Sequence, residues 1–364
     1  MQELTSLYKS FNVFDSMEDL VRIRNQNGTV LFENKAMKSL IQELYRDGKS
    51  NYNIVRLFYN LSNPTTLNKS TIKRDIEIQD KIYSVKVSPV FEKDEIIGYI
   101  EVFRDVTTET RISEELFNAH KKINDDIILA RTIQKSILPR RLNFKNIHFQ
   151  YGHIPSDNLS GDIFDVVEID EDRIGVYIAD VVGHGISASI MTMFIRQTMK
   201  NILIEFPNIQ PSDTLNELKR RFSMLMLDES QYFTIVYMLI DTKKGKLTYV
   251  NAGHNCMPLL FNDHKVAFMR NRGLFISSIF PEVKYNEKSI DLHAGNKILL
   301  YTDGLLETTD RNGVRFGEES LKKWIIKNSN NPRLVTSLQK HLNTYRWLEQ
   351  KDDVAMLFMD IRAK

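Results

Sequence analysis

Four short acidic segments stand out in the C-terminal part of the chain, because each places an aspartate at the edge of an apolar, strand-like run. The four aspartates are Asp162, Asp180, Asp303 and Asp352. If those strand edges converge, several carboxylates share a small volume, where like charges repel strongly unless cations neutralise them. A single aspartate at a strand end is ordinarily a turn residue. The hypothesis of a site therefore depends on the four acting together.

Oxygen ligands of this kind favour a hard divalent cation. The chain contains one cysteine, Cys256, which excludes an internal disulfide and a cysteine-based zinc site. Carboxylates suit Mg²⁺ or Mn²⁺ better than Zn²⁺. Two such ions about 3.5–4 Å apart activate a water molecule and clamp a phosphoryl group during in-line displacement. A neighbouring glycine such as Gly304 lets backbone and substrate come close to the metal site.

Strands and outer helices must hold these aspartates in place. Residues 233–240 and 246–250, joined by a Lys-Lys-Gly turn, predict an antiparallel hairpin. Apolar residues at helical spacing predict helices over 187–205, 211–227 and 332–348. Ser187 or Ser189 is the candidate cap of the first helix.

The ordered set of motifs over residues 125–360 closely resembles the PPM-type serine/threonine phosphatases of the SpoIIE branch, which includes the regulator-of-sigma-factor phosphatases. The matching segments are 130–139, 160–165, 179–185, 233–234, 249–255, 301–307 and 352–354. The resemblance implies an α/β/β/α sandwich of two antiparallel sheets. It also implies hydrolysis of phosphoserine or phosphothreonine in a protein, with two Mn²⁺ or Mg²⁺ ions and no other cofactor.

The resemblance further assigns roles to single residues. Asp180 is expected to bridge the two ions. Asp162 and the backbone carbonyl of Val181 complete one ion, and Asp303 and Asp352 complete the other. Three further residues are expected to contact these ligands without binding an ion themselves: Asp165, Gly304 and Asp353. An activated water is the expected nucleophile, so no phosphoenzyme should form.

Two histidines near the motifs are not assigned to catalysis. Eukaryotic relatives carry a histidine two residues after the bridging aspartate, where this chain has Val182. His184 is therefore interpreted as part of a turn, and water at the metals would protonate the leaving serine. His254 is interpreted as a hydrogen-bonding residue rather than a ligand.

The first 108 residues predict a small α+β domain with two hairpins, one over 19–32 around Asn27-Gly28 and one over 81–103 around a turn at 92–95. Helical patterns lie between them. The stretch from Gly98 to Thr107 resembles the closing strand of a PAS sensor domain, which leads directly into a signalling helix. Any small α+β domain that ends in a hairpin is the alternative. This part contains no histidine, since the first is His120, which argues against a haem sensor. It also contains no cysteine, which argues against a flavin-adduct sensor.

Residues 109–139 predict a charged helix that Pro139 ends. Its apolar residues follow a heptad pattern. One position holds Leu116, Ile123, Ala130 and Ile137, and the other holds Ile112, Ala119, Asp126 and Ile133. We expect a parallel dimeric coiled coil; one amphipathic helix packed on its own domain is the alternative.

Composition excludes other classes of protein. The 49 Lys and Arg residues nearly balance the 47 Asp and Glu residues, for a net charge of +2, so nothing favours binding to nucleic acid or to a membrane. The N-terminus has no signal-peptide pattern, and no apolar run approaches the ~20 residues of a spanning helix. We expect a soluble, cytoplasmic protein.

These observations define an α+β chain of three parts: a PAS-like domain at 1–108, a coiled-coil helix at 109–139 and a phosphatase domain at 140–364. The predicted function is that of a homodimeric, PAS-regulated phosphatase. Its expected partner is a phosphorylated anti-anti-sigma factor of the STAS type in a bacterial stress pathway. A dimeric sensor with an inactive phosphatase-like domain is the alternative. A nucleotide cyclase also uses paired aspartates, but no purine-binding signature is present.

Overall fold

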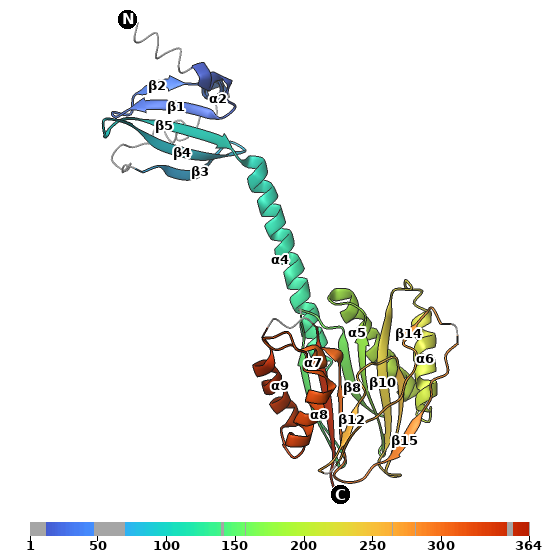
Figure 1. Ribbon diagram of the computed structural model, residues 1–364. Helices are drawn as coiled ribbons and strands as arrows, with labels where there is room; N and C mark the ends of the chain where they lie inside the picture. Colours follow the sequence, from blue (N-terminus) through green and yellow to red (C-terminus); the bar gives the residue numbers. More distant parts are fainter. Residues whose placement is uncertain are drawn as a thin grey trace, which may run out of the picture. The chain divides into compact units, whose positions relative to one another are not determined.

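The computed structural model describes residues 12–46, 70–139, 142–156, 158–263, 265–280, 282–347 and 352–363. The chain divides into two compact units, Met1–Lys122 and Ile123–Lys364 (Figure 1). The division falls inside helix α4 (Thr107–Ser136). No helix in the described ranges is long and apolar enough to cross a membrane.

Within its described residues, the first unit has one antiparallel sheet of five strands in the order β2-β1-β5-β4-β3. Its elements are η1 Asn12–Ser16, β1 Leu20–Asn25, β2 Val30–Glu33, α2 Lys35–Arg46, β3 Ile72–Ile78, β4 Lys81–Glu92 and β5 Glu95–Asp105. Both predicted hairpins are confirmed, as β1–β2 and β4–β5. Strand β3 was not predicted. Helix α2 accounts for part of the helical pattern between the hairpins, and the rest of that pattern lies outside the described residues.

A buried asparagine joins helix α2 to the sheet. The Asn34 side-chain oxygen accepts hydrogen bonds from the backbone N–H of Met37 at 3.0 Å and of Val21 at 3.1 Å. The first bond caps the helix, and the second ties the cap to strand β1. Beside it, the Arg22 guanidinium pairs with the fully buried Glu101 at 2.6 Å.

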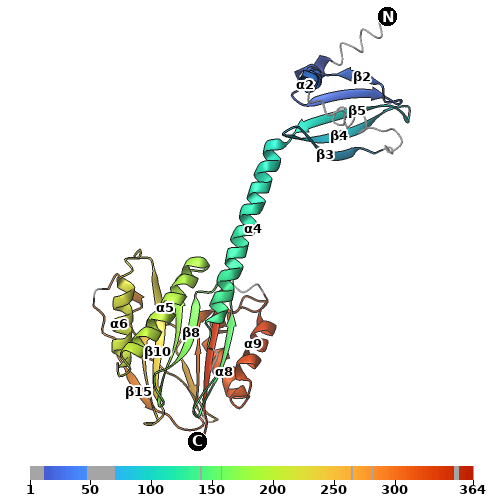
Figure 2. The ribbon, with the colours of Figure 1, turned by 180° about the vertical axis from the view of Figure 1, so that it is seen from behind.

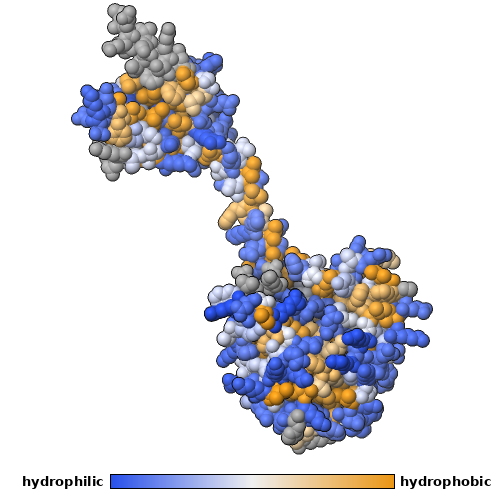
Figure 3. All heavy atoms as spheres, viewed as in Figure 1, coloured by the Kyte–Doolittle hydropathy of each residue, from blue (hydrophilic) through white to orange (hydrophobic). Residues whose placement is uncertain are grey.

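Helix α4 begins where strand β5 ends. Asp105 accepts hydrogen bonds from the backbone N–H and the hydroxyl of Thr107, at 3.1 and 2.6 Å. The same hydroxyl accepts a bond from the backbone of Ile82 at 2.8 Å, which fixes the first turn of the helix to strand β4. The helix ends at Ser136, three residues before Pro139. Most of its surface is exposed, including apolar side chains that Figure 3 shows along its length.

The part of the second unit that the structure describes forms two six-stranded antiparallel sheets. The first sheet has the order β15-β11-β10-β9-β8, with β14 paired to β10. Its strands are β8 Asp162–Glu168, β9 Arg173–Val181, β10 Tyr232–Asp241, β11 Lys246–Ala252, β14 Ile276–Ser277 and β15 Lys288–Asp291. The pairing of β10 with β11 confirms the predicted hairpin.

The second sheet has the order β13-β12-β16-β17-β7-β6, so that β17, late in the chain, lies between β16 and β7. Its strands are β6 Asn143–Phe144, β7 Ile147–Ile154, β12 Leu259–Phe261, β13 Val266–Phe268, β16 Lys297–Tyr301 and β17 Val354–Ile361. Eight residue pairs join β17 to β7, from Val354↔Ile154 to Ile361↔Ile147.

Helices cover the outer faces of the two sheets (Figures 1 and 2). Helices α5 (Ile186–Glu205) and α6 (Pro211–Ser223) pack on the first sheet, and α7 (Asp303–Glu307), α8 (Gly317–Asn328) and α9 (Leu334–Tyr345) lie on the second. A third apolar core lies between the sheets and contains Phe164, Ile178, Leu300 and Leu357. The predicted α/β/β/α sandwich is therefore confirmed.

The helix boundaries correct several expectations. Helix α6 ends at Ser223, four residues before its predicted end, and Met226 beyond it has a positive φ of 50°. Helix α5 is capped by neither Ser187 nor Ser189. Its cap is Gly185, which has a φ of 81° and makes no side-chain bond. Glycine adopts this left-handed conformation without the steric cost that a side chain brings.

Candidate functional site

Strands β8 and β9 place the first two aspartates side by side. Asp162 opens β8 and Asp180 lies near the end of β9, and the two are direct partners in the antiparallel register. Both share a strand face with residues of the inter-sheet core, Phe164 on β8 and Ile178 on β9. Because side chains alternate along a strand, both carboxylates lie at one end of the first sheet, on the face toward the second sheet.

Thr302 connects the two sheets at this end. It follows strand β16, and its hydroxyl donates to the Asp162 carboxylate at 2.7 Å and accepts from the backbone N–H of Ala355 at 2.9 Å. Thr302 is buried. The next residue, Asp303, begins helix α7. The third predicted aspartate therefore follows directly on a residue that contacts the first.

A glycine brings Asp303 against the fourth aspartate. A Cβ placed on Gly304 would lie 2.0 Å from the carbonyl oxygen of Asp353 and 3.2 Å from the carbonyl carbon of Asp352. Any side chain at this position would push helix α7 away from the start of strand β17. Gly304 thus permits close approach of the α7 backbone to the start of strand β17.

The electrostatics of the group reflect this proximity. Burial, followed by the negative charges of neighbouring aspartates, raises the pKa of Asp180 to about 8; those neighbours are Asp303, Asp352 and Asp353. Burial and the charge of Asp180 raise the pKa of Asp162 well above its ordinary value. Burial also raises the pKa of Asp352, with further repulsion from Asp303. Burial and neighbouring negative charges thus destabilise the charged forms of Asp162, Asp180 and Asp352.

A divalent cation fits this donor set. The four side chains offer only carboxylate oxygens, and a cation would relieve the repulsion that contributes to the raised pKa values of Asp162, Asp180 and Asp352. Across the parts of the chain that the structure describes, no three acidic, histidine or cysteine side chains stand close enough to form a complete metal cage. The aspartates are thus gathered at one end of the sandwich without being drawn onto a common centre.

Asp353 holds the loop that precedes Asp162. One of its carboxylate oxygens accepts bonds from the backbone N–H and hydroxyl of Ser156, at 2.7 and 2.9 Å. The other accepts from the backbone N–H of Gly161 at 2.7 Å. Gly161 in turn accepts a bond from the N–H of Val181 at 3.1 Å, next to Asp180. Asp353 therefore ties Ser156 and Gly161 to the start of strand β17.

Ser160, in the same loop, has contacts that the sequence analysis did not assign. Its hydroxyl accepts from the N–H of Asp162 at 3.1 Å and lies 3.0 Å from a ring nitrogen of His153. Its backbone is hydrogen-bonded to the side chain of Gln134 on helix α4. Thr302 was likewise unassigned. Both Gln134 and Thr302 belong to the matching motifs. Their positions in those motifs are the one sequence feature that could have indicated their roles.

Three other residues of the motifs bond groups other than the four aspartates or are exposed. Asp165 faces helix α5 and forms an ion pair with Arg196 at 2.9 Å. His184 is exposed in the turn before α5. His254 is buried, with its ring nitrogens 3.0 Å from the Thr234 hydroxyl and 3.0 Å from a backbone carbonyl oxygen, which confirms its hydrogen-bonding role.

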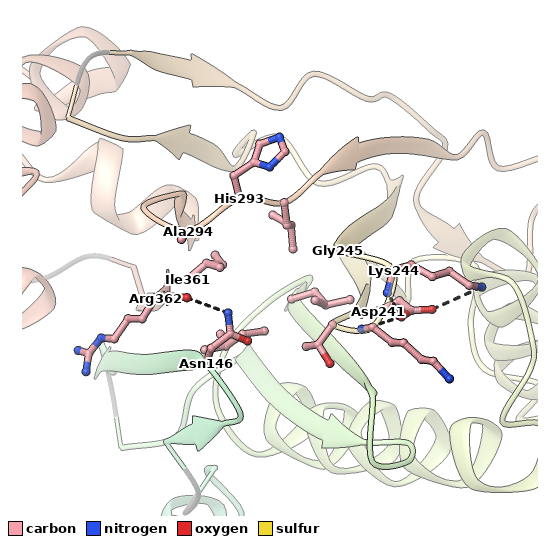
Figure 4. Close-up of a pocket in the computed structure, with 13 residues that line it drawn as sticks. Asn146, Asp241, Lys244, Gly245, His293, Ala294, Ile361 and Arg362 are labelled. Atoms are coloured by element: carbon pink, nitrogen blue, oxygen red, sulfur yellow. Dashed lines mark hydrogen bonds and ion pairs between the residues drawn. The ribbon is translucent and has the colours of Figure 1, made fainter. Parts of the chain in front are cut away.

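A pocket of about 390 Å³ lies at the opposite end of the sandwich (Figure 4). It is lined by Asp241, Lys244, His293 and Arg362 among others. Asp241 pairs with Arg173 at the far end of the β9–β10 ladder, whereas Asp180 pairs with Thr234 at the near end. The pocket is therefore separate from the aspartates.

Solved structures share this fold. The SiaA-PP2C domain of Pseudomonas aeruginosa superposes with a TM-score of 0.60 at 22% identity, over 68% of this chain and 99% of that domain. The PP2C phosphatase domain of SpoIIE from Bacillus subtilis, with a fragment of its regulatory domain, gives 0.52 at 14% identity, over 90% of this chain and 93% of that one. The second unit therefore has a PP2C-type fold.

The sequence comparison gives the family. The model of Stage II sporulation protein E (SpoIIE) matches residues 170–362, and the chain belongs to the SpoIIE family. The matched range contains Asp180, Asp303 and Asp352, and Asp162 precedes it.

Two curated relatives come from Bacillus subtilis (strain 168). Phosphoserine phosphatase RsbP is 30% identical over 188 residues, 50% of this chain and 46% of RsbP. Phosphoserine phosphatase RsbU is 27% identical over 222 residues, 60% of this chain and 62% of RsbU. The chain thus spans about half the length of RsbP and three fifths of RsbU.

Proposed function

We propose that this chain is a divalent-metal-dependent protein serine/threonine phosphatase. The observation that carries the proposal is the meeting of both sheets at Thr302, whose hydroxyl bonds Asp162 while its neighbour Asp303 packs against the start of β17. Asp162, Asp180, Asp303 and Asp352 would hold two Mn²⁺ or Mg²⁺ ions together with the carbonyl of Val181. The relatives RsbP and RsbU are named as phosphoserine phosphatases, which supports the same chemistry here.

The residues of this chain have separate tasks in that reaction. When bound, the ions supply an activated water and neutralise charge on the phosphoryl group. Thr302 orients the carboxylate of Asp162 by donating to one of its oxygens, and Asp353 holds the loop before Asp162. Gly304 lets Asp303 approach Asp352. Overall, a water oxygen attacks phosphorus, the bond from phosphorus to the serine oxygen breaks, and a proton passes to that oxygen.

The direct test is phosphate release by purified full-length chain with manganese, from a phosphopeptide or an aryl phosphate. Asp303→Asn should reduce kcat/KM by about 100-fold or more, as expected when one ligand of a metal site is lost. Asp263→Asn is the matched control, because Asp263 lies on an exposed turn beside Lys297 at the far end of strand β16. Equal rates for Asp303→Asn and wild type would contradict the proposal.

Calorimetric titration separates this function from the alternative. Binding of manganese to wild type, weakened in Asp303→Asn, is expected of the phosphatase. Absence of both metal binding and hydrolysis would favour a dimeric sensor with an inactive phosphatase-like domain.

We further propose a phosphorylated regulator of a sigma-factor pathway as substrate, an anti-anti-sigma protein of the STAS type. Support comes from the sequence match to RsbP and RsbU. The test is release of phosphate from a phosphoserine-bearing STAS protein at a kcat/KM well above that for a free phosphopeptide. Equal values would argue against a STAS-type protein as the substrate.

We propose that the first unit is a PAS-type sensor. The support is its five-stranded antiparallel sheet and the direct passage of strand β5, through Asp105 and Thr107, into helix α4. A ligand or signal acting on this unit should change the specific activity of the full chain.

We also propose that α4 forms a parallel dimeric coiled coil. Most of its heptad residues are exposed, with Leu116 57% and Ile123 56% accessible, whereas Ala130 is half-buried and Ile137, past the end of the helix, packs against the core of the second unit. An apolar stripe of this kind is normally covered by a second helix. Sedimentation equilibrium should give a dimer, and Leu116→Glu should shift it toward monomer.

A further inference from the structure

Gln134 differs from the rest of helix α4. Within α4, all of which the structure describes, it is the one buried residue, at 5% exposure. A buried amide is costly unless its donor and acceptor are both satisfied. Here the side chain has partners for both groups.

The partners are the two backbone groups of a single residue in the site. The Gln134 side-chain nitrogen donates to the carbonyl oxygen of Ser160 at 2.7 Å, and its oxygen accepts from the N–H of Ser160 at 3.1 Å. The same nitrogen lies 3.4 Å from the Thr192 hydroxyl on helix α5. A bidentate contact of this kind fixes both the position and the orientation of the Ser160 backbone.

Ser160 passes this constraint to the first aspartate. Its hydroxyl accepts the N–H of Asp162, and the intervening Gly161 is held between Asp353 and Val181. A shift of Gln134 along or around the axis of α4 would break at least one of its two bonds to Ser160. The loop would then lose its constraint on the side toward α4.

The opposite end of the same helix is fixed in the first unit. Asp105 and Ile82 bond Thr107 in its first turn, and Arg111 donates to the carbonyl of Asp80 at 3.1 Å. An α-helix transmits rotation and translation along its axis because each turn is hydrogen-bonded to the next. Helix α4 is thus hydrogen-bonded to strand and loop residues near its first turn and to Ser160 near its last turn.

From these contacts we propose that Gln134 is a positioning residue, which holds the Ser160–Asp162 loop in the geometry needed for metal binding and makes that geometry sensitive to movement of α4. The inference rests on the proposed function for its effect on hydrolysis. The predicted effect of Gln134 on the loop rests only on its hydrogen bonds to Ser160.

The first experiment compares Gln134→Leu and Gln134→Glu with wild type in the full chain. Gln134→Leu loses both bonds, whereas Gln134→Glu keeps an acceptor for Ser160 and loses the donor. Gln197→Leu is the matched control, because Gln197 is exposed on α5 and its side chain donates to that of Asn201 one turn further on. Residues that orient metal ligands typically contribute 10–100-fold to metal affinity or activity.

Three measurements decide the outcome. Gln134→Leu should lower kcat for an aryl phosphate by about 10–100-fold with KM within about twofold, and should weaken manganese binding in calorimetry. Without metal, hydrogen–deuterium exchange of a peptide covering residues 158–164 should quicken at least fivefold, while peptides from strand β10 stay unchanged. Gln134→Glu should lie between Gln134→Leu and wild type.

Exchange in Gln134→Leu equal to that in Gln197→Leu would overturn the inference whatever the activity. Quickened exchange in β10 as well would also overturn it, because the residue would then support the domain as a whole. If wild type releases no phosphate, the proposed function fails, and the exchange result still decides whether Gln134 positions the loop.

The second experiment tests transmission through the helix. One alanine inserted between Asp125 and Asp126 turns the following residues by about 100°, whereas a seven-residue insertion nearly restores the face. We expect the single insertion to lower kcat at least fivefold when Gln134 is present. In the Gln134→Leu background, the same insertion should lower kcat by less than a further twofold. Equal effects in both backgrounds would refute transmission through Gln134.

Discussion

Substitution of one glycine should test how tightly the two halves of the acidic site are packed. In Gly304→Ala, the new methyl group would lie 2.0 Å from the Asp353 carbonyl oxygen, against an ordinary contact of 3.4–4 Å. Relief requires helix α7 and strand β17 to separate by more than 1 Å. Overpacking of this kind costs about 1–3 kcal/mol, which for a domain of this size lowers Tm by roughly 2–12 °C.

The effect on catalysis should exceed the effect on stability. Asp303 and Asp352 stand on the two segments that are forced apart, and misplacement by about 1 Å can cost about 100-fold in rate. We expect kcat/KM for p-nitrophenyl phosphate with manganese to fall by about that factor. The assay is a manganese titration of initial rates, with thermal unfolding measured on the same samples.

A second glycine provides the control. Gly313 has a positive φ of 76° and no atom within 4 Å of an added Cβ, so Gly313→Ala should lower Tm by a few degrees and leave kcat/KM unchanged. If Gly304→Ala keeps kcat/KM within twofold and Tm within 1 °C of wild type, the close approach of α7 to β17 does not exist as described.

Three further changes give distinct expected results. Thr302→Val removes a hydrogen bond to the Asp162 carboxylate, worth about 1.5–3 kcal/mol when the acceptor is charged, and should lower both Tm and the affinity for manganese in calorimetry; an unchanged affinity would contradict its orienting role. Hydrogen bonds from Thr107 lower the pKa of Asp105 to about 2 from 3.8. The stability this adds is present above about pH 4 and is lost as the pH falls toward 2, so the Tm difference between wild type and Asp105→Asn should shrink over that interval and not widen. Asp126→Leu replaces the polar heptad residue and should tighten dimerisation in sedimentation equilibrium at least tenfold; weaker association would refute the parallel coiled-coil register.

Local signals predicted the elements of the fold well. Asn27-Gly28 and the Lys-Lys-Gly turn before Lys246 mark hairpins, because few residue pairs accept those backbone angles, and both hairpins form. Strand β3 and helix α8 were missed. Helix α5 starts from Gly185 rather than from a serine cap, since the turn after Asp180 itself sets the entry of the chain into the helix.

The site shows where sequence reasoning ends. Asp162 and Asp180 could be paired in principle, because each borders a strand in a hairpin. The contact of Thr302 with Asp162 joins residues 140 positions apart, and that of Asp353 with Gly161 joins residues 192 apart. The spacing of residues along a single helix or strand cannot predict such contacts, because they arise from the way the two sheets are connected. The assignment of individual metal ligands stays a prediction for the experiments above.

The place of strand β17 has a consequence for biosynthesis. β17 fills the gap between β16 and β7, and its partner β7 precedes it by about 200 residues. On the ribosome, every other strand of the sandwich emerges first, and the second sheet stays split until β17 arrives. Pairing across such a separation is slow. Asp352 and Asp353 arrive with that strand, so a nascent chain carries no complete set of carboxylates. The set of four carboxylates proposed to bind metal is therefore complete only once β17 has been made.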